Sequence, residues 1–247
     1  MNFTFTAKPA TFLARPNRFR IEARLHATGD VVAAHCADPG RLRELLIPGV
    51  TVYISRADNP ARKTAYDLRF VTHPENGQLV SLDSRVPNAL VWEELRAQRL
   101  PPFAGAQTIA REVTTPLQHG GVRSRFDFRL VDAAGTPCWI EVKSATLVEE
   151  GVARFPDAPT VRGRRHVEEL TALRRTGDRA AVLFIIQRPD AVRLEPKRDT
   201  DPEFAAALAT AAGAGVEMIA YTCTLTPERI ELCDQVPVVQ TERQQKS

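Results

Sequence analysis

The first third of the chain alternates apolar and polar residues over short runs, and pairs of turn-forming residues separate these runs. Gly29-Asp30, Pro48-Gly49 and Asn76-Gly77 are breaks of this kind. Alternation with a period of two is typical of strands that bury one face. The pattern predicts a short helix at Gly40–Leu46 and strands at Phe19–Leu25, Val31–Cys36, Val50–Arg56, Ala65–Thr72 and Leu79–Leu82.

Five strands within about 70 residues suit a small closed barrel of the oligonucleotide-binding (OB) type. Another small β-barrel or β-sandwich without a ligand would give the same pattern, so that alternative stays open.

Val86-Pro87-Asn88 marks the predicted domain boundary, and apolar residues at helical spacing follow it. Asn88 is predicted to cap a helix at Ala89–Gln98. The continuous apolar run Ala180–Gln187 predicts a strand that is buried on both faces. The remaining strands are expected at Thr108–Thr114, Val122–Val131, Cys138–Ser144, Val216–Cys223 and Arg229–Leu232. Helices are expected at Thr160–Arg175 and after Asp201, which is predicted to cap a helix with Pro202 at its first position. Hairpin strands followed by strand-helix-strand crossovers indicate a mixed sheet flanked by helices.

We therefore expect an α/β (α+β) chain with a barrel domain at residues 1–84, a mixed-sheet domain at 85–239 and a polar tail at 240–247. No apolar run approaches the roughly 20 residues that a membrane helix needs. Met1–Leu13 lacks the continuous apolar stretch of a secretory signal. The expected location is the cytoplasm, without membrane contact.

The most informative side chains lie on a hairpin of the second domain. If its turn is centred on Ala134, antiparallel pairing sets Asp127 opposite Glu141 and Arg125 opposite Lys143. Like charges on directly opposed residues repel each other. Two opposed carboxylates therefore suggest a bound divalent cation, and Mg²⁺ is commonly held by one or two carboxylates together with waters and phosphate oxygens.

This arrangement suits phosphodiester hydrolysis. A cation held by Asp127 and Glu141 would lower the pKa of a bound water, and Lys143 would orient that water or stabilise developing negative charge. Regular alternation would turn Phe126 and Phe128 to the face opposite Asp127. The alternative is an exposed salt-bridge cluster without catalytic function, because such triplets are common.

Basic residues offer candidate phosphate contacts, although the formal net charge of only +3 does not itself indicate a nucleic-acid ligand. Thr160 is predicted to cap a helix on which Arg162 and His166 share one face. With Arg165, this helix start is a dense basic patch, and Glu168 and Glu169 would neutralise it if it were merely a solvated surface. The other candidates for nucleic-acid binding are Arg18, Arg20, Arg41, Arg62, Lys63 and Arg125.

A series of short stretches stands in order along nearly the whole chain: Arg18-Phe19, His35-Cys36, Pro48-Gly49, Asn59-Pro60-Ala61-Arg62-Lys63-Thr64, Pro87-Asn88-Ala89-Leu90-Val91, Ser124-Arg125-Phe126-Asp127-Phe128, Ile140-Glu141-Val142-Lys143-Ser144, Phe155-Pro156-Asp157-Ala158, Arg162-Gly163 with His166, and Gly215-Val216-Glu217. In these stretches the chain resembles the bacterial sugar fermentation stimulation protein A family. So many ordered matches are more specific than the Asp…Glu-x-Lys signature alone.

The resemblance implies an N-terminal OB domain and a C-terminal domain similar to restriction endonucleases of the PD-(D/E)xK superfamily. Carried over by position, the catalytic residues would be Asp127, Glu141, Lys143 and Glu93, and the helix start would be Thr160, Arg162 and His166. The resemblance also implies DNA binding and an association with stimulation of sugar, notably maltose, metabolism genes.

The chain departs from the family pattern in one loop. The family usually reads His-Cys-Pro-Asn-Thr-Gly-Arg where this sequence has His35-Cys36-Ala37-Asp38-Pro39-Gly40-Arg41. The acidic Asp38 weakens the case for a phosphate-binding function of this loop.

Three functional hypotheses follow. The first is a DNA-binding protein with a Mg²⁺- or Mn²⁺-dependent nuclease site. The second is a non-catalytic DNA-binding regulator of sugar metabolism genes. The third is a metabolic enzyme that acts on a phosphorylated or sugar ligand. A homodimer is left open, because no sequence feature decides the oligomeric state.

Overall fold

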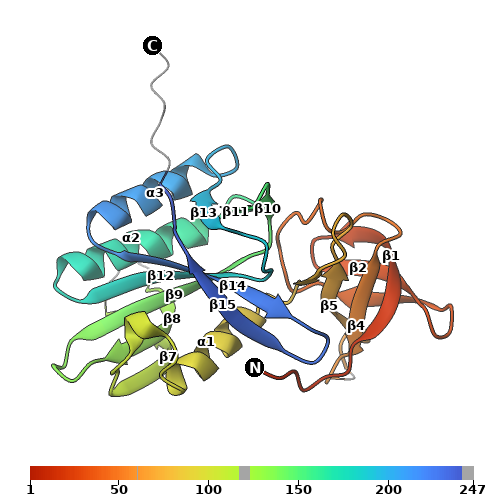
Figure 1. The fold of residues 1–247 in the computed structure, drawn as a ribbon, viewed down its shortest axis with the longest axis horizontal. Helices are drawn as coiled ribbons and strands as arrows, with labels where there is room; N and C mark the ends of the chain where they lie inside the picture. Colours follow the sequence, from red (N-terminus) through yellow and green to blue (C-terminus); the bar gives the residue numbers. More distant parts are fainter. Residues whose placement is uncertain (60, 117–122, 241–247) are drawn as a thin grey trace, which may run out of the picture.

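The strands of the N-terminal part close into a five-stranded barrel (Figure 1). The computed structural model describes residues 1–59, 61–116 and 123–240. The barrel strands are β1 (Lys8–Asn17), β2 (Arg20–Leu25), β3 (Val31–His35), β4 (Thr51–Arg56) and β5 (Tyr66–Thr72). They follow the order β3-β2-β1-β4-β5, and a parallel pairing of β3 with β5 closes the ring. The short strand β6 (Leu79–Ser81) pairs with β5 outside it.

The predicted barrel is confirmed, but two of its elements differ from the prediction. Strand β1 was not predicted, because prolines at both ends of Lys8–Asn17 obscure its alternation. The helix predicted at Gly40–Leu46 is wrong, since the segment forms turns and Leu42 has a left-handed φ of 51°. Leu42 and Leu45 are fully buried in the barrel core, so their helix-like spacing reflects burial.

The second part is a six-stranded mixed sheet flanked by helices, as predicted (Figure 1). Its strand order is β15-β14-β12-β9-β8-β7, in which β9, β12 and β14 run parallel. Helices α2 and α3 cover one face, and α1 packs on the other. The elements are α1 (Val86–Arg96), the 3₁₀ helix η1 (Pro101–Phe103), β7 (Thr108–Thr114), β8 (Arg125–Val131), β9 (Pro137–Ala145), α2 (Val161–Arg175), β12 (Arg179–Ile186), α3 (Pro202–Gly213), β14 (Glu217–Leu225) and β15 (Ile230–Val236).

The ends of the helices follow side-chain chemistry. The Thr160 hydroxyl accepts a hydrogen bond from the Gly163 N–H, and the Asp201 carboxylate accepts one from the Phe204 N–H, so both predicted caps are confirmed. The cap predicted at Asn88 is wrong, because α1 already begins after Arg85. Within the described ranges, no helix combines the length and the apolar character needed to cross a membrane.

A second, three-stranded sheet was not predicted. It consists of β10 (Val148–Glu149), β11 (Val152–Phe155) and β13 (Arg193–Pro196). Strands of two to four residues are too short to show a hydrophobic period, which explains the omission. Residues 117–122, which include the beginning of the predicted strand Val122–Val131, lie outside the described residues.

Contacts between residues far apart in sequence join the barrel to the mixed-sheet part. The Asp157 carboxylate accepts a hydrogen bond from the Leu42 N–H at 2.9 Å, and at the end of the barrel part the Ser84 hydroxyl donates to the Ala37 carbonyl of the same loop. Gly40 lies so close to this junction that a Cβ there would approach the Asp157 carboxylate to 2.9 Å. A side chain at position 40 would therefore displace the Asp157 or Asp38 carboxylate where the β3–β4 loop meets the second part.

Candidate active site

The register of hairpin β8–β9 sets the position of the acidic pair. The two strands pair from Phe128–Ile140 to Val131–Pro137, which is the register expected for a turn centred on Ala134. One step further, Asp127 would face Glu141. The ladder ends before this step, and Asp127 instead accepts a hydrogen bond from the Val142 N–H at 2.7 Å.

The strand is distorted at Asp127. Phe126 belongs to the core under α2, whereas Phe128 belongs to the core under α1, so the prediction that both share one face is wrong. On β7 the residue between the partners of Phe126 and Phe128 is Glu112, whose φ is 54°. Non-glycine residues in this region cost about 1–3 kcal/mol and concentrate at functional sites.

Glu141 lies almost buried between two cationic or protonatable partners. Its Oε1 accepts a hydrogen bond from the Lys143 ammonium at 2.6 Å and lies 2.5 Å from Nδ1 of His166. Burial by itself would raise the pKa of Glu141, but Lys143 and His166 together lower it below the ordinary value. Glu141 is therefore a carboxylate at neutral pH, held in one orientation.

The other oxygen of Glu141 marks the open side of the site. Oε2 is buried and has no hydrogen-bond partner within the described ranges. A buried carboxylate oxygen without a partner is costly, so such an atom in a native fold calls for a bound water or ion. Oε2 is thus the position at which a cation would complete the environment of Glu141.

The pKa of Asp127 is affected by the charge of Glu141. Burial first, and the negative charge of Glu141 second, raise the pKa of Asp127 to about 6, although the Val142 N–H, Lys143 and the Asn88 amide counteract them. The two carboxylates therefore repel each other. A divalent cation between them would relieve this repulsion.

The donor set fits a hard divalent cation of the magnesium type. In the part of the chain that the structure describes, no group of three or more His, Cys, Asp and Glu side chains is arranged to hold a metal ion. Mg²⁺ does not need one, because it retains several waters and often takes only one or two carboxylates. Asp127 and Glu141 supply that number.

Comparisons with known proteins decide the family. A family model described as the sugar fermentation stimulation protein RE domain matches residues 85–229, and the SfsA N-terminal OB domain model matches residues 13–82. The chain belongs to the sugar fermentation stimulation protein family. The expected resemblance is confirmed, and with it the fold class of an OB-like barrel followed by a restriction-endonuclease-like mixed sheet.

Relatives within the family are similar over nearly their full length. A sugar fermentation stimulation protein homolog of Moorella thermoacetica is 49% identical over 230 residues, covering 93% of this chain and 95% of the relative. A homolog of Chloroflexus aggregans is 46% identical over 229 residues, covering 93% and 84%. The solved structure of Pyrococcus furiosus SfsA in complex with Ca²⁺ matches with a TM-score of 0.84 and 32% identity, covering 97% of this chain and 98% of that one.

One family position lies differently from what the resemblance implied. Glu93 is not brought to the acidic pair, because its half-exposed carboxylate faces the Met1 amino group at 3.5 Å. From the same helix α1, Asn88 reaches the site instead and donates to Asp127 at 2.6 Å. The sequence signal for Asn88 was present, but it was interpreted as a helix cap.

His166 was expected to contact nucleic acid, and its burial contradicts this. It is only 2% exposed and lies against Glu141, so it orients the carboxylate. Thr160 is likewise occupied by its capping bond. Arg162 is exposed and contacts His166 at 3.4 Å, whereas the Arg165 guanidinium lies 3.7 Å from the buried Glu169. Arg162 is thus more accessible than Arg165, which is only partly exposed.

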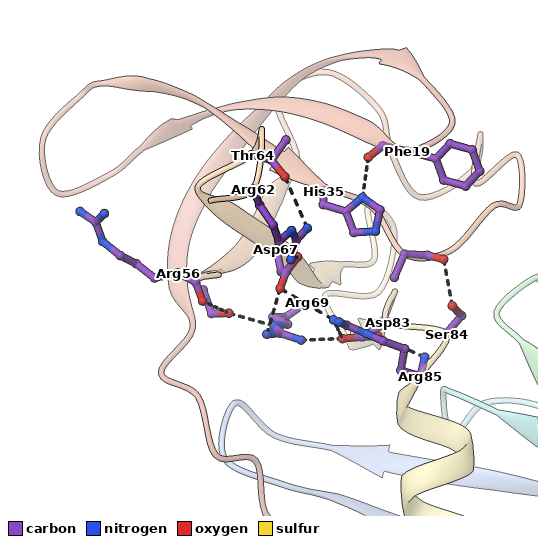
Figure 2. A network of polar contacts seen from close by, with 12 residues as sticks. Phe19, His35, Arg56, Arg62, Thr64, Asp67, Arg69, Asp83, Ser84 and Arg85 are labelled. Atoms are coloured by element: carbon purple, nitrogen blue, oxygen red, sulfur yellow. Dashed lines mark hydrogen bonds and ion pairs between the residues drawn. The ribbon is translucent and has the colours of Figure 1, made fainter. Parts of the chain in front are cut away.

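The remaining basic candidates divide into paired and unpaired side chains. Arg62 forms an ion pair with Asp67 at 2.8 Å, beside the buried Arg69–Asp83 pair of the barrel (Figure 2). Exposed ion pairs also occupy Arg20, with Glu22, and Arg125, with Glu112. Among the described residues, no carboxylate pairs with Arg18, Arg41 or Lys63, which are exposed.

Proposed function

We propose that this protein binds DNA and hydrolyses phosphodiester bonds at a metal site formed by Asp127 and Glu141, with Mg²⁺ or Mn²⁺ as the cofactor. The observation that supports this most directly is the buried, unpartnered Oε2 of Glu141 beside a second buried carboxylate. The Ca²⁺ complex of the related Pyrococcus furiosus protein is consistent with a divalent cation in this family.

Each neighbouring side chain has a role in this proposal. Asp127 and Glu141 would hold the cation, which would act as a Lewis acid and lower the pKa of a bound water. Asn88 and His166 fix the orientation of the two carboxylates through their hydrogen bonds. Lys143, whose side chain is 13% exposed, keeps its ammonium at Glu141 and would donate to a phosphate oxygen or to the attacking water.

The test is cleavage of labelled DNA by the purified protein with Mg²⁺, Mn²⁺ or EDTA. We expect cleavage only with a cation, and a loss of at least about 100-fold in Lys143→Met and Glu141→Gln, because each removes a charge used in the reaction. Lys197→Met is the matched control, since Lys197 pairs with an exposed glutamate, Glu149, at 3.0 Å.

The alternative of a non-catalytic DNA-binding regulator makes a different prediction. DNA binding that weakens steeply with salt, without cleavage under any metal condition, would contradict the hydrolase and leave binding in place. No salt-dependent DNA retention at all would contradict both and favour an enzyme of small phosphorylated or sugar ligands.

A further inference from the structure

An aromatic side chain projects from the barrel where the first two strands meet. Phe19 lies in the turn between β1 and β2, and half of its surface is exposed. Its ring stacks on His35 of β3, with centroids 6.5 Å apart and an interplanar angle of 18° (Figure 2). Nδ1 of His35 is also 3.1 Å from the Phe19 carbonyl oxygen, which fixes the pair.

Exposure of a large aromatic ring at this place has a functional explanation. Barrels of the OB type bind oligonucleotides with strands 2 and 3 and with the loop between strands 1 and 2. Phe19 occupies that loop, and His35 belongs to strand 3. Aromatic rings in such positions stack on bases, a contact that intact duplex DNA does not offer because its base faces are already stacked.

A basic cleft of about 320 Å³ lies beside this turn. Four arginines line it, and no carboxylate does: Arg15, Arg18, Arg41 and Arg43. Arg15 is structural, since its guanidinium donates to the carbonyls of Arg18, Gly40 and Arg41. The other three are exposed, and none has a carboxylate partner within the described residues.

The acidic Asp38 does not oppose this cleft. It is 8% exposed, and its carboxylate accepts the Gly40 N–H at 2.8 Å instead of lining the surface. The loop that departs from the family pattern therefore still presents Arg41 and Arg43 outward.

The cleft extends from the barrel to the segment that precedes helix α2. Ala158 and Pro159 of the second part line its far wall. The next residue, Thr160, caps α2, whose first turns carry the exposed Arg162 and the His166 that bonds to Glu141. The backbone of a DNA strand that follows these arginines would thus pass from Phe19 towards Glu141.

We infer that this cleft binds the phosphodiester backbone of an unpaired DNA segment, with one base stacked on Phe19. The inference rests on the proposed function and specifies its substrate class, namely DNA with a single-stranded extension or branch next to the cleavage site. Phosphates would contact Arg18, Arg41 and Arg43 on the way to the acidic pair.

The test measures binding by fluorescence anisotropy in EDTA, so that it does not depend on cleavage. The probes are a blunt duplex and the same duplex with a single-stranded extension. We expect tighter binding of the extended duplex, and a loss of this preference of about tenfold in Phe19→Ala. Phe19→Trp should retain the preference. Val31→Ala, which truncates another exposed apolar side chain of the barrel, should not alter it.

The arginines are tested by the salt dependence of the same binding. Arg41→Ala should reduce the slope of log K against log salt by about 0.7, as expected for one lost single-strand phosphate contact. Arg24→Ala, at the other end of β2, should leave the slope unchanged.

The outcomes separate the inference from the proposed function. A Phe19→Ala protein that folds normally and still prefers the extended duplex would overturn the inference even if the wild type cleaves DNA. An equal loss in Val31→Ala would overturn it as well. Extension-dependent binding that requires Phe19, without any cleavage, would support the inference and contradict the hydrolase.

Discussion

Asn88 is the side chain through which helix α1 reaches the acidic pair. Its amide donates to Oδ1 of Asp127 at 2.6 Å, while the Val142 N–H occupies Oδ2. Both bonds stabilise the charged form of a carboxylate whose pKa burial and Glu141 raise to about 6. Asn88 therefore favours the ionised state that a cation requires, although it would not itself touch the cation.

Replacing Asn88 with alanine should weaken catalysis without abolishing the metal site. Losing a hydrogen bond to a ligating carboxylate typically costs about 10- to 100-fold in metal affinity or activity. We expect Asn88→Ala to raise the Mg²⁺ concentration for half-maximal cleavage by such a factor. Arg96→Gln, on the same helix, is the control. Unchanged Mg²⁺ dependence in Asn88→Ala would contradict the assigned role of the amide.

At the level of elements, the sequence pattern predicted those features that depend on residues close together in the chain. The turn around Ala134 fixed the register of β8 and β9, and thereby placed Asp127 near Glu141. The sequence did not reveal the distortion of β8 at Asp127, since the left-handed Glu112 that accompanies it belongs to another strand, β7. The helix predicted at Gly40–Leu46 was wrong for a similar reason, because the spacing of its leucines reflects their packing into the barrel core from a non-helical loop.

That loop also holds a carboxylate with a strongly altered environment. The pKa of Asp38 is raised from 3.8 to about 6: burial is the largest cause, Asp157 and Asp83 add to the increase, and the Gly40 N–H and Arg15 counteract it. The folded protein thus binds a proton at Asp38 more tightly than the unfolded chain does. The contribution of Asp38 to the free energy of unfolding is therefore greatest below about pH 4 and is lost as the pH rises through about 6.

Asp38→Asn should remove this loss, because asparagine keeps an acceptor for Gly40 and does not ionise. We expect the variant to unfold with a free energy about 1–2 kcal/mol higher than the wild type at pH 7.5, and with little difference near pH 4. Urea unfolding at both pH values measures this. Asp30→Asn, in an exposed turn, should show neither effect. A stabilisation of equal size at both pH values would exclude ionisation as its cause.

On the scale of the whole molecule, function depends on the relation between barrel and mixed sheet. The family resemblance predicted both folds, but not the surface between them, because this surface is made by residues more than 100 positions apart, such as Leu42 and Asp157. The N-terminal segment adds a second connection. Phe3 donates its N–H to the Glu228 carbonyl and packs against the core under α1, and its ring centroid lies 5.2 Å from that of Phe70 of the barrel, with the two rings tilted by 47°.

If Phe3 couples the two parts, Phe3→Ala should weaken the coupling more than the folding of either part. We expect a loss of about 1–2 kcal/mol, below the roughly 3–5 kcal/mol of a fully buried phenylalanine, and a calorimetric transition that broadens or splits in two. Phe19→Ala is the matched control, because its exposed ring should affect DNA binding and not the melting profile. A single transition at the wild-type temperature in Phe3→Ala would show that Asp157 and its neighbours hold the parts together without the N-terminal segment.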